Sequence, residues 1–154
     1  MKAVLLAGGL GSRLRPYTWV LPKPLIPVGD QPVIALLLKQ LRKHGVEEAI
    51  ITLGYLGELI QAACADGAQW GIRLNYVNEE KPLGTIGPLS YLREHLTETF
   101  LVSNGDVVAD INIHDLVDFH HQKGGIATVA CYKKRYSVDY GILTMDDSGH
   151  VRSF

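Results

Sequence analysis

Hydrophobic positions follow two kinds of pattern along this chain. Short runs of consecutive apolar residues predict buried strands, whereas apolar residues spaced three or four apart predict amphipathic helices. The runs predict strands at residues 2–7, 49–53, 72–77, 100–103, 126–133, 141–145 and 151–154. The helical spacing predicts helices at residues 31–44, 55–65, 87–96 and 113–122. Pro32 suits the first turn of the first helix, and Gly45 suits its end.

Strands and helices alternate over most of the chain. This order predicts a Rossmann-like α/β fold, a mostly parallel mixed sheet with right-handed crossovers and helices on both faces. The polar turn at residues 146–149 should begin a hairpin into the last predicted strand. No repeat, low-complexity tract or linker interrupts residues 1–154, so we expect a single domain. Ligands of such sheets bind at the carboxyl ends of the strands.

The composition limits which binding partners and which cellular compartment we expect for this protein. The 154 residues include 15 Lys and Arg against 16 Asp and Glu, a formal net charge of −1. A balanced charge does not favour nucleic acid or an anionic membrane surface as a partner. The apolar runs are too short to span a bilayer, and the N-terminus lacks the pattern of a signal peptide. Cys64 and Cys131 are far apart, which favours free thiols, and we expect a cytoplasmic protein.

A glycine-rich loop follows the first predicted strand. Its residues, Leu6 to Pro16, read Leu-Ala-Gly-Gly-Leu-Gly-Ser-Arg-Leu-Arg-Pro, and Pro-Lys-Pro follows around Lys23. Glycines let backbone N–H groups approach a polyanion closely. Arg13 adds a planar, permanently charged group, and Lys23 adds a compact point charge. Together these features predict a binding site for a triphosphate.

Two other phosphate-binding loops fit less well. The P-loop requires a Gly-Lys-Ser/Thr ending, but Gly11 is followed by Ser12 and Arg13. The dinucleotide fingerprint requires a third glycine where Leu14 stands, and no acidic residue closes a second strand to hold a ribose. A dinucleotide-binding domain of an oxidoreductase is therefore the weaker alternative.

The loop and the Pro-Lys-Pro segment together resemble a family signature. They match L-A-G-G-x-G-x-R-L-x-P followed by P-K-P, the signature of the sugar-1-phosphate nucleotidyltransferases (nucleoside-diphosphate-sugar pyrophosphorylases), at every fixed position. The resemblance implies the nucleotide-diphospho-sugar transferase fold and Mg²⁺-dependent transfer from an NTP to a sugar 1-phosphate, releasing pyrophosphate. It also implies self-association into a homo-oligomer. In this chain the loop residues that would bind the nucleotide are Leu6, Ala7, Gly8, Gly9, Gly11, Ser12 and Arg13.

Arg13 and Lys23 are the candidate catalytic residues. Nucleotidyl transfer depends mainly on positioning and on neutralising the negative charge that grows at the phosphates. We expect Arg13 to hold the β- and γ-phosphates and the departing pyrophosphate. The resemblance places Lys23 at the α-phosphate and the incoming sugar phosphate.

Asp106 is the candidate metal ligand. It ends the run Asn104-Gly105-Asp106 after a predicted strand, and a carboxylate there suits Mg²⁺ beside a triphosphate. In the family the aspartate of this Gly-Asp step binds the metal. A second family aspartate and a Glu-Lys-Pro segment have no counterpart, so we expect a C-terminally incomplete domain, holding the nucleotide half and the start of the sugar half. Because both candidate segments follow strands, they should meet in one cleft.

Residues 79–87 resemble the base-recognition loop of the family. Gly84 lets the backbone approach the base, and Thr85 follows as in many members. The Glu79 carboxylate only accepts hydrogen bonds, which suits the N1–H and N2–H of guanine, although uracil or thymine also offers N3–H. The sequence Pro-Leu-Gly-Thr-x-Gly in this loop resembles that of the mannose-1-phosphate guanylyltransferase branch. GTP is therefore favoured over a uridylyl or thymidylyl donor.

The sugar site has one candidate residue. Tyr140-Gly141-Ile142 resembles the family step in which the glycine backbone, here Gly141, lines the sugar pocket. A non-catalytic subunit that senses nucleotide sugars is a further alternative, which the missing second aspartate favours and the intact Arg13, Lys23 and Asp106 oppose.

Overall fold

The computed structural model describes residues 1–81, 83–137 and 140–153. The chain divides into two compact units, Met1–Asp118 and Phe119–Phe154. The first contains the parallel sheet and the helical residues up to Asp118, and the second contains a short hairpin.

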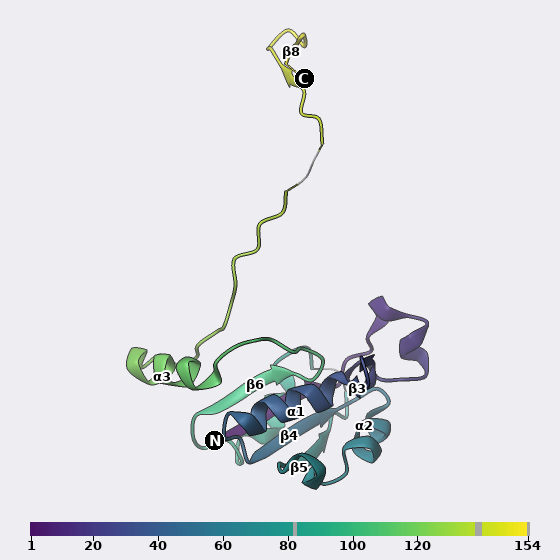
Figure 1. Cartoon of the computed structure of the whole chain (residues 1–154), viewed down its shortest axis with the longest axis vertical. Helices are drawn as coiled ribbons and strands as arrows, with labels where there is room; N and C mark the ends of the chain where they lie inside the picture. Colours follow the sequence, from purple (N-terminus) through teal and green to yellow (C-terminus); the bar gives the residue numbers. More distant parts are fainter. Residues whose placement is uncertain (82, 138–139, 154) are drawn as a thin grey trace. The chain divides into compact units, whose positions relative to one another are not determined.

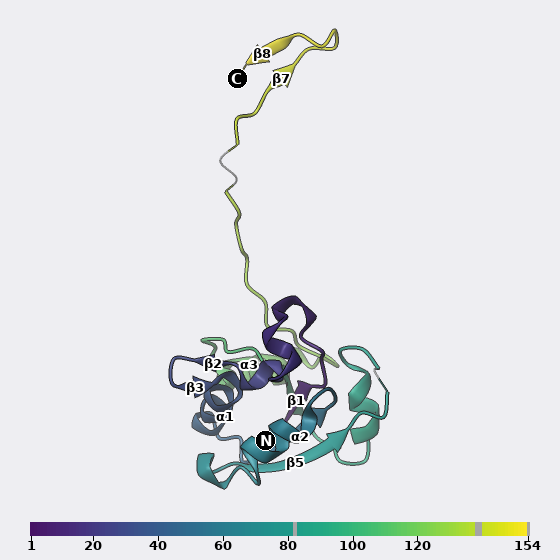
Figure 2. The same ribbon diagram turned by 90° about the vertical axis from the view of Figure 1, so that its right-hand side faces the viewer.

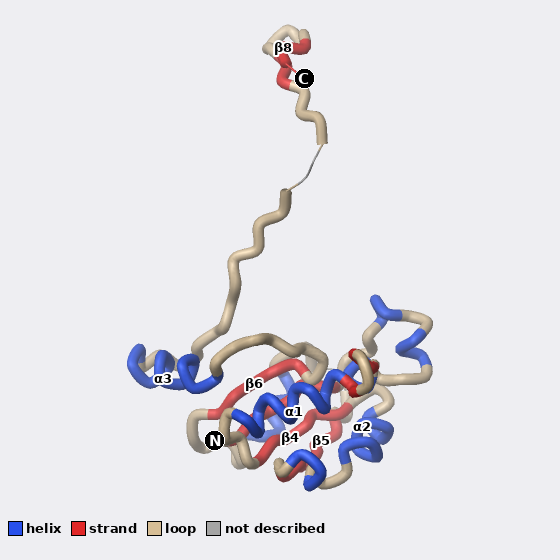
Figure 3. Tube along the Cα trace, viewed as in Figure 1, coloured by secondary structure: helices blue, strands red, loops and turns tan. Residues whose placement is uncertain are grey.

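A four-stranded parallel sheet forms the centre of the first unit (Figures 1 and 3). Its strands are β1 (Lys2–Ala7), β4 (Glu48–Leu53), β5 (Arg73–Asn78) and β6 (Phe100–Asn104). Their order is β5-β4-β1-β6, with Leu6 of β1 opposite Thr52 of β4 and Asn104 of β6. The chain thus builds outward from β1 to β5 and then returns to the other side of β1. This reversal makes the carboxyl ends of β1 and β6 the place where such sheets bind ligands.

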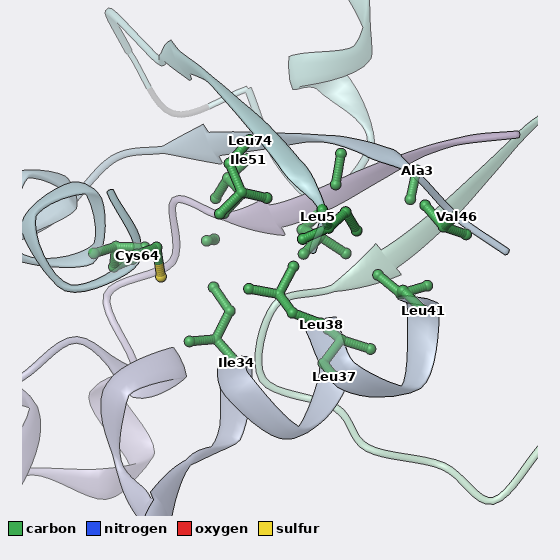
Figure 4. Close-up of a cluster of buried hydrophobic side chains, with 14 of the residues drawn as sticks. Ala3, Leu5, Ile34, Leu37, Leu38, Leu41, Val46, Ile51, Cys64 and Leu74 are labelled. Atoms are coloured by element: carbon green, nitrogen blue, oxygen red, sulfur yellow. The ribbon is translucent and has the colours of Figure 1, made fainter. Parts of the chain in front are cut away.

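The three α-helices are α1 (Val33–Lys43), α2 (Gly57–Cys64) and α3 (Ile113–Lys123). Ile34, Leu37, Leu38 and Leu41 form the buried stripe of α1, and they pack in one cluster with strand residues such as Leu5 (Figure 4). Their spacing of three and four residues is the helical repeat that the sequence pattern indicates. Burial of this stripe against the sheet fixes α1 on one face.

The opposite face of the sheet is covered differently. A 3₁₀ segment, Gly87–Leu92, replaces the helix predicted at residues 87–96. Its Leu92 is buried against Val4 and Ile50. Helical segments therefore cover both faces of an all-parallel sheet, which confirms the predicted fold class, with the α-helices on one face and the 3₁₀ segment Gly87–Leu92 on the other.

The start of α1 differs from the prediction by two residues. Pro32 has an extended ψ of 148° and precedes the helix instead of lying in its first turn. Residues Gln31–Pro32 form strand β3, which pairs with β2 (Pro27–Val28) beside the start of α1 (Figure 2). The four strands of the parallel sheet and the helices α2 and α3 lie within one or two residues of their predicted bounds, as expected for element ends.

The second unit contains a hairpin of β7 (Thr144–Met145) and β8 (Val151–Ser153). Its turn is held by the Asp146 carboxylate, which accepts the backbone N–H groups of His150 and Ser148 at 3.0 Å. The N–H of His150 and then the Ser148 hydroxyl are the main causes that lower the pKa of Asp146. The turn and hairpin at residues 146–153 confirm the prediction, while Phe154 lies outside the described residues.

In this unit one strand prediction was wrong and a second was too long. Residues 126–133 form no strand, and the strand predicted at 141–145 is reduced to β7. A strand requires a neighbour for its N–H and C=O groups. Among the described residues, none pairs with 126–133, and Ile126 and Val129 are exposed. An apolar run alone does not supply that neighbour.

Among residues 1–81, 83–137 and 140–153, no helix has the length and hydrophobicity needed to cross a membrane. Cys64 is buried and Cys131 is exposed, and both are free thiols.

Candidate active site

The site is assembled where β1 and β6 end. The N–H of Gly105, the residue after β6, donates to the Leu6 carbonyl of β1 at 2.8 Å. Gly105 is buried, and a Cβ there would lie 3.2 Å from the Ala7 Cβ and 3.6 Å from the Pro24 Cγ. This fit holds Asp106 next to the end of β1 and to the Pro-Lys-Pro segment.

Lys23 and Asp106 meet at this place. The Lys23 Nζ lies 2.5 Å from the Asp106 Oδ2, and both side chains are partly exposed. Lys23 begins a 3₁₀ turn that is closed by the Leu25 N–H donating to the Pro22 carbonyl at 2.9 Å. The structure therefore brings together the candidate lysine and the candidate metal ligand, which lie far apart in the sequence.

Glu79 lies against the first glycine of the loop. A Cβ on Gly8 would lie only 2.2 Å from the Glu79 Oε1, so only glycine leaves room for the carboxylate in this position. The Glu79 N–H donates to the Leu53 carbonyl at 2.8 Å, which ties the residue after β5 to the end of β4. Glu79 therefore shares the strand-end edge of the sheet with the glycine loop.

Gly54 is a residue that sequence reasoning missed. A Cβ there would lie 2.5 Å from the Gly8 carbonyl oxygen and 2.8 Å from the Gly8 Cα, so two backbones are in direct contact. A glycine placed directly after a predicted buried strand was the available signal, because glycine at a strand end often marks such an approach.

The loop itself turns outward from the sheet. Gly11 adopts a left-handed conformation with φ 59°, and the 3₁₀ turn Ser12–Leu14 follows. Arg13 is exposed and makes no ion pair among the described residues. Gly9 is exposed, and a Cβ on it would meet no atom within 4 Å. The arginine and the space above Gly9 are thus open to a ligand.

Three predicted residues are not brought to this group by any contact. Gly84, with φ 76°, and Thr85 lie in an exposed loop after β5. Gly141 belongs to the second unit, in a stretch without regular secondary structure. The roles predicted for these residues remain predictions.

Comparisons with known proteins identify the family of the chain. The family model for nucleotidyl transferases matches residues 2–154. The chain belongs to this family. Its relatives include sugar-1-phosphate nucleotidyltransferases, the family that the sequence signature resembles.

Two curated relatives of this nucleotidyltransferase differ in their nucleotide. Mannose-1-phosphate guanylyltransferase catalytic subunit beta of Danio rerio is 38% identical over 159 residues, covering 100% of this chain and 44% of that protein. UTP–glucose-1-phosphate uridylyltransferase of Synechocystis sp. is 34% identical over 168 residues, covering 100% and 43%. The chain thus spans less than half the length of these relatives.

A solved structure supports the fold. The crystal structure of a protein assigned as a glucose-1-phosphate thymidylyltransferase, from Bacillus anthracis, superimposes with a TM-score of 0.72 at 28% identity. The match covers 79% of this chain and 50% of that one. The parallel sheet is therefore the nucleotidyltransferase sheet.

The residues at this edge of the sheet fit a magnesium ion that takes part of its ligands from phosphate and water. The described residues contain no cluster of three or more His, Cys, Asp or Glu side chains placed to hold a metal. Mg²⁺ commonly takes one or two carboxylates and fills its remaining positions with phosphate oxygens and water. Asp106, partly exposed beside the open glycine loop, supplies one such carboxylate.

Proposed function

We propose that residues 1–154 supply the nucleotide-binding half of one catalytic domain that transfers a nucleotidyl group to a sugar 1-phosphate. GTP is the favoured donor and a mannose 1-phosphate-like hexose the favoured acceptor. The observation that carries the proposal is the contact of Lys23 with Asp106, 2.5 Å apart, at the strand ends that the glycine loop shares.

The reaction explains why these charges gather here. A phosphate oxygen of the sugar 1-phosphate attacks the α-phosphorus, the bond from that phosphorus to the β-phosphate bridging oxygen breaks, and pyrophosphate leaves. Negative charge grows on the leaving group, and fixed cations stabilise it. Arg13 has a free guanidinium for the β- and γ-phosphates. When bound at Asp106, Mg²⁺ supplies further charge neutralisation.

Lys23 forms an ion pair with the Asp106 carboxylate. Its ammonium group therefore lies within reach of any phosphate that approaches that carboxylate. Its ammonium is a compact donor suited to the α-phosphate and the incoming sugar phosphate. Gly9 leaves open space in front of the loop backbone, since a Cβ there would meet no atom within 4 Å. Neither packing nor a left-handed φ requires glycine at this position. Room for a ligand is a reason for glycine at this position.

The base preference rests on Glu79. Its carboxylate lies against Gly8 and accepts hydrogen bonds, which matches the two adjacent N–H donors of guanine. The guanylyltransferase name of the Danio rerio relative supports this donor. The uridylyltransferase name of the Synechocystis relative supports the second candidate, because the uracil N3–H also donates to a carboxylate.

The test is to titrate this chain with GTP, dTTP, UTP, ATP and CTP in Mg²⁺ and to measure the melting temperature of the chain with each nucleotide. We expect GTP to raise Tm most, because bound ligand stabilises only the folded state. Arg13→Ala and Lys23→Ala should remove most of the shift, whereas Lys43→Ala, an exposed lysine at the end of α1, should preserve it.

Two results would contradict the proposal. A Tm that no nucleotide raises would show that the chain lacks a nucleotide site. A shift that survives both Arg13→Ala and Lys23→Ala would show that the nucleotide binds elsewhere. A larger shift with UTP or dTTP than with GTP would replace the guanylyl donor and leave the phosphate site unchanged.

A further inference from the structure

Thr18 is buried in a loop that is otherwise open to solvent. Its side chain and backbone are 1% exposed, whereas the neighbouring Tyr17 and Trp19 are 72% and 61% exposed. Among residues 8–20 it alone is fully buried. A small polar residue in this position, between two exposed aromatic residues, must make a specific contact to be retained inside.

That contact is with Gly11. The Thr18 hydroxyl donates to the Gly11 carbonyl oxygen at 2.9 Å. The Thr18 methyl group lies below the same residue, since a Cβ on Gly11 would be 2.9 Å from the Thr18 Cγ2 and 3.5 Å from the Lys23 Cβ. Thr18 therefore touches Gly11 with both branches of its side chain.

The Gly11 carbonyl also holds the turn that carries Arg13. It accepts the Leu14 N–H at 2.9 Å, the bond that closes the 3₁₀ turn Ser12–Leu14. The Gly11 carbonyl oxygen thus accepts two hydrogen bonds, one from the Leu14 N–H that closes the turn and one from the Thr18 hydroxyl. Fixing this carbonyl fixes the direction in which the Arg13 turn leaves the sheet.

We propose that Thr18 is a positioning residue for the phosphate-binding loop. Its hydroxyl locks the Gly11 carbonyl and thereby orients the Arg13 turn relative to the segment that leads to Lys23. The inference rests on the proposed nucleotide site, and Thr18 acts through Gly11 without touching the nucleotide. A second bond supports the anchor, because the Tyr55 hydroxyl donates to the Trp19 carbonyl at 3.2 Å.

Three substitutions separate the hydroxyl from the packing. Thr18→Val keeps the shape and removes the donor, whereas Thr18→Ser keeps the donor and removes the methyl group. Thr52→Val is the matched control. Thr52 is 0% exposed, and its hydroxyl has no hydrogen-bond partner among the described residues, so the same change there breaks no bond.

The first measurement is the dissociation constant of Mg²⁺–GTP for the 154-residue chain by calorimetry, together with Tm. Loss of one hydrogen bond predicts an affinity roughly fivefold to tenfold weaker in Thr18→Val. Thr18→Ser and Thr52→Val should bind like the wild type, and Tm of Thr18→Val should fall by only a few degrees. Wild-type affinity in Thr18→Val, or equal losses in Thr18→Val and Thr18→Ser, would overturn the proposal.

The second measurement needs no nucleotide. Trypsin cleaves after Arg13, and the rate of that cut reports how firmly the exposed turn is held. We expect faster cleavage in Thr18→Val than in the wild type, with Thr18→Ser restoring the wild-type rate. Equal rates in all three would overturn the role of Thr18. If the wild type binds no nucleotide, the proposed function fails while this comparison still decides the inference.

Discussion

Individual glycines at the strand ends have different surroundings, and these surroundings separate structural from ligand-binding roles. A side chain on Gly54 would strike the backbone of Gly8, while one on Gly8 would strike the mobile end of the Glu79 side chain. One on Gly9 would strike nothing within 4 Å. Substitutions at the three positions should therefore differ in kind as well as in size.

Gly54→Ala should destabilise the fold. Its Cβ would lie 2.5 Å from the Gly8 carbonyl oxygen, and a backbone atom in a sheet-end loop cannot move away freely. We expect a loss of about 1–3 kcal/mol in the free energy of unfolding, the usual size for overpacking, measured by urea denaturation. Unchanged stability would show that β1 and β4 separate more easily at their ends than this contact implies.

Gly8→Ala should act on nucleotide selection. The clashing atom is the Glu79 Oε1, at 2.2 Å, and a glutamate side chain can rotate away at little expense in stability. We expect Tm to change by no more than a few degrees while the preference for GTP over UTP weakens.

The measurement that tests the role of Glu79 is the ratio of the GTP and UTP dissociation constants, compared between the wild type and the variants Gly8→Ala and Glu79→Gln. Both variants should lower the preference, because both remove the carboxylate from its position. An unaltered ratio in both would exclude Glu79 from base recognition.

At the scale of elements, the end of α2 is joined to β5 by a tyrosine. The Tyr76 hydroxyl donates to the Ala65 carbonyl at 2.6 Å, where the chain leaves α2 with a left-handed φ of 48°. Burial raises the pKa of Tyr76 to about 12, with Cys64 and Asp66 adding to the effect. Burial also raises the pKa of Cys64 to about 11. Both groups are therefore neutral in the folded protein near neutral pH.

This arrangement predicts a loss of stability in alkali. Both groups ionise more easily in the unfolded chain, at their ordinary values of 9.0 for Cys64 and 10.0 for Tyr76. Their contribution is therefore complete below about pH 9 and is lost as the pH rises toward 11 and 12. Tm should fall over that range, and the fall should be shallower in Cys64→Ala and Tyr76→Phe than in the wild type. Parallel Tm curves for all three would contradict the assignment.

The elements also show what the sequence pattern can predict. The central strands β1 and β4 are buried over most of their length, so they contain apolar runs such as Val4 to Leu6 that the pattern identifies directly. Residues 126–133 carry the same pattern without a neighbouring strand in the described structure, and pairing is a property that no single segment encodes. Pro32 is compatible with the first turn of a helix and with a short β-strand. Its pairing with Pro27 places it in the strand β3.

The candidate site divides in the same way. The family signature predicted Arg13 and Lys23 as candidates, and the strand end predicted Asp106, because each lies in a local pattern. Gly54 and Thr18 depend on contacts with Gly8 and Gly11. Only the position of Gly54 after a predicted strand hinted at its contact, and no local pattern indicates the hydrogen bond of Thr18.

At the scale of the whole molecule, the hydrophobic core lies entirely within the first unit. Its buried apolar residues extend from Ala3 to Ile113. A chain shortened to residues 1–123, which keeps all of α3, should therefore unfold cooperatively with Tm within a few degrees of the full chain. Calorimetry of the two chains measures this directly. A broad or strongly lowered transition would show that residues 124–154 contribute to the core.

The position of β1 between β4 and β6 has a consequence for the entropy of binding. Both edges of β1 are hydrogen-bonded, so its backbone amides should be among the slowest in the protein to exchange with solvent. The phosphate-binding loop begins at the end of this strand. A nucleotide bound as we propose would meet a loop whose base is already ordered, and this order lowers the loss of backbone freedom on binding.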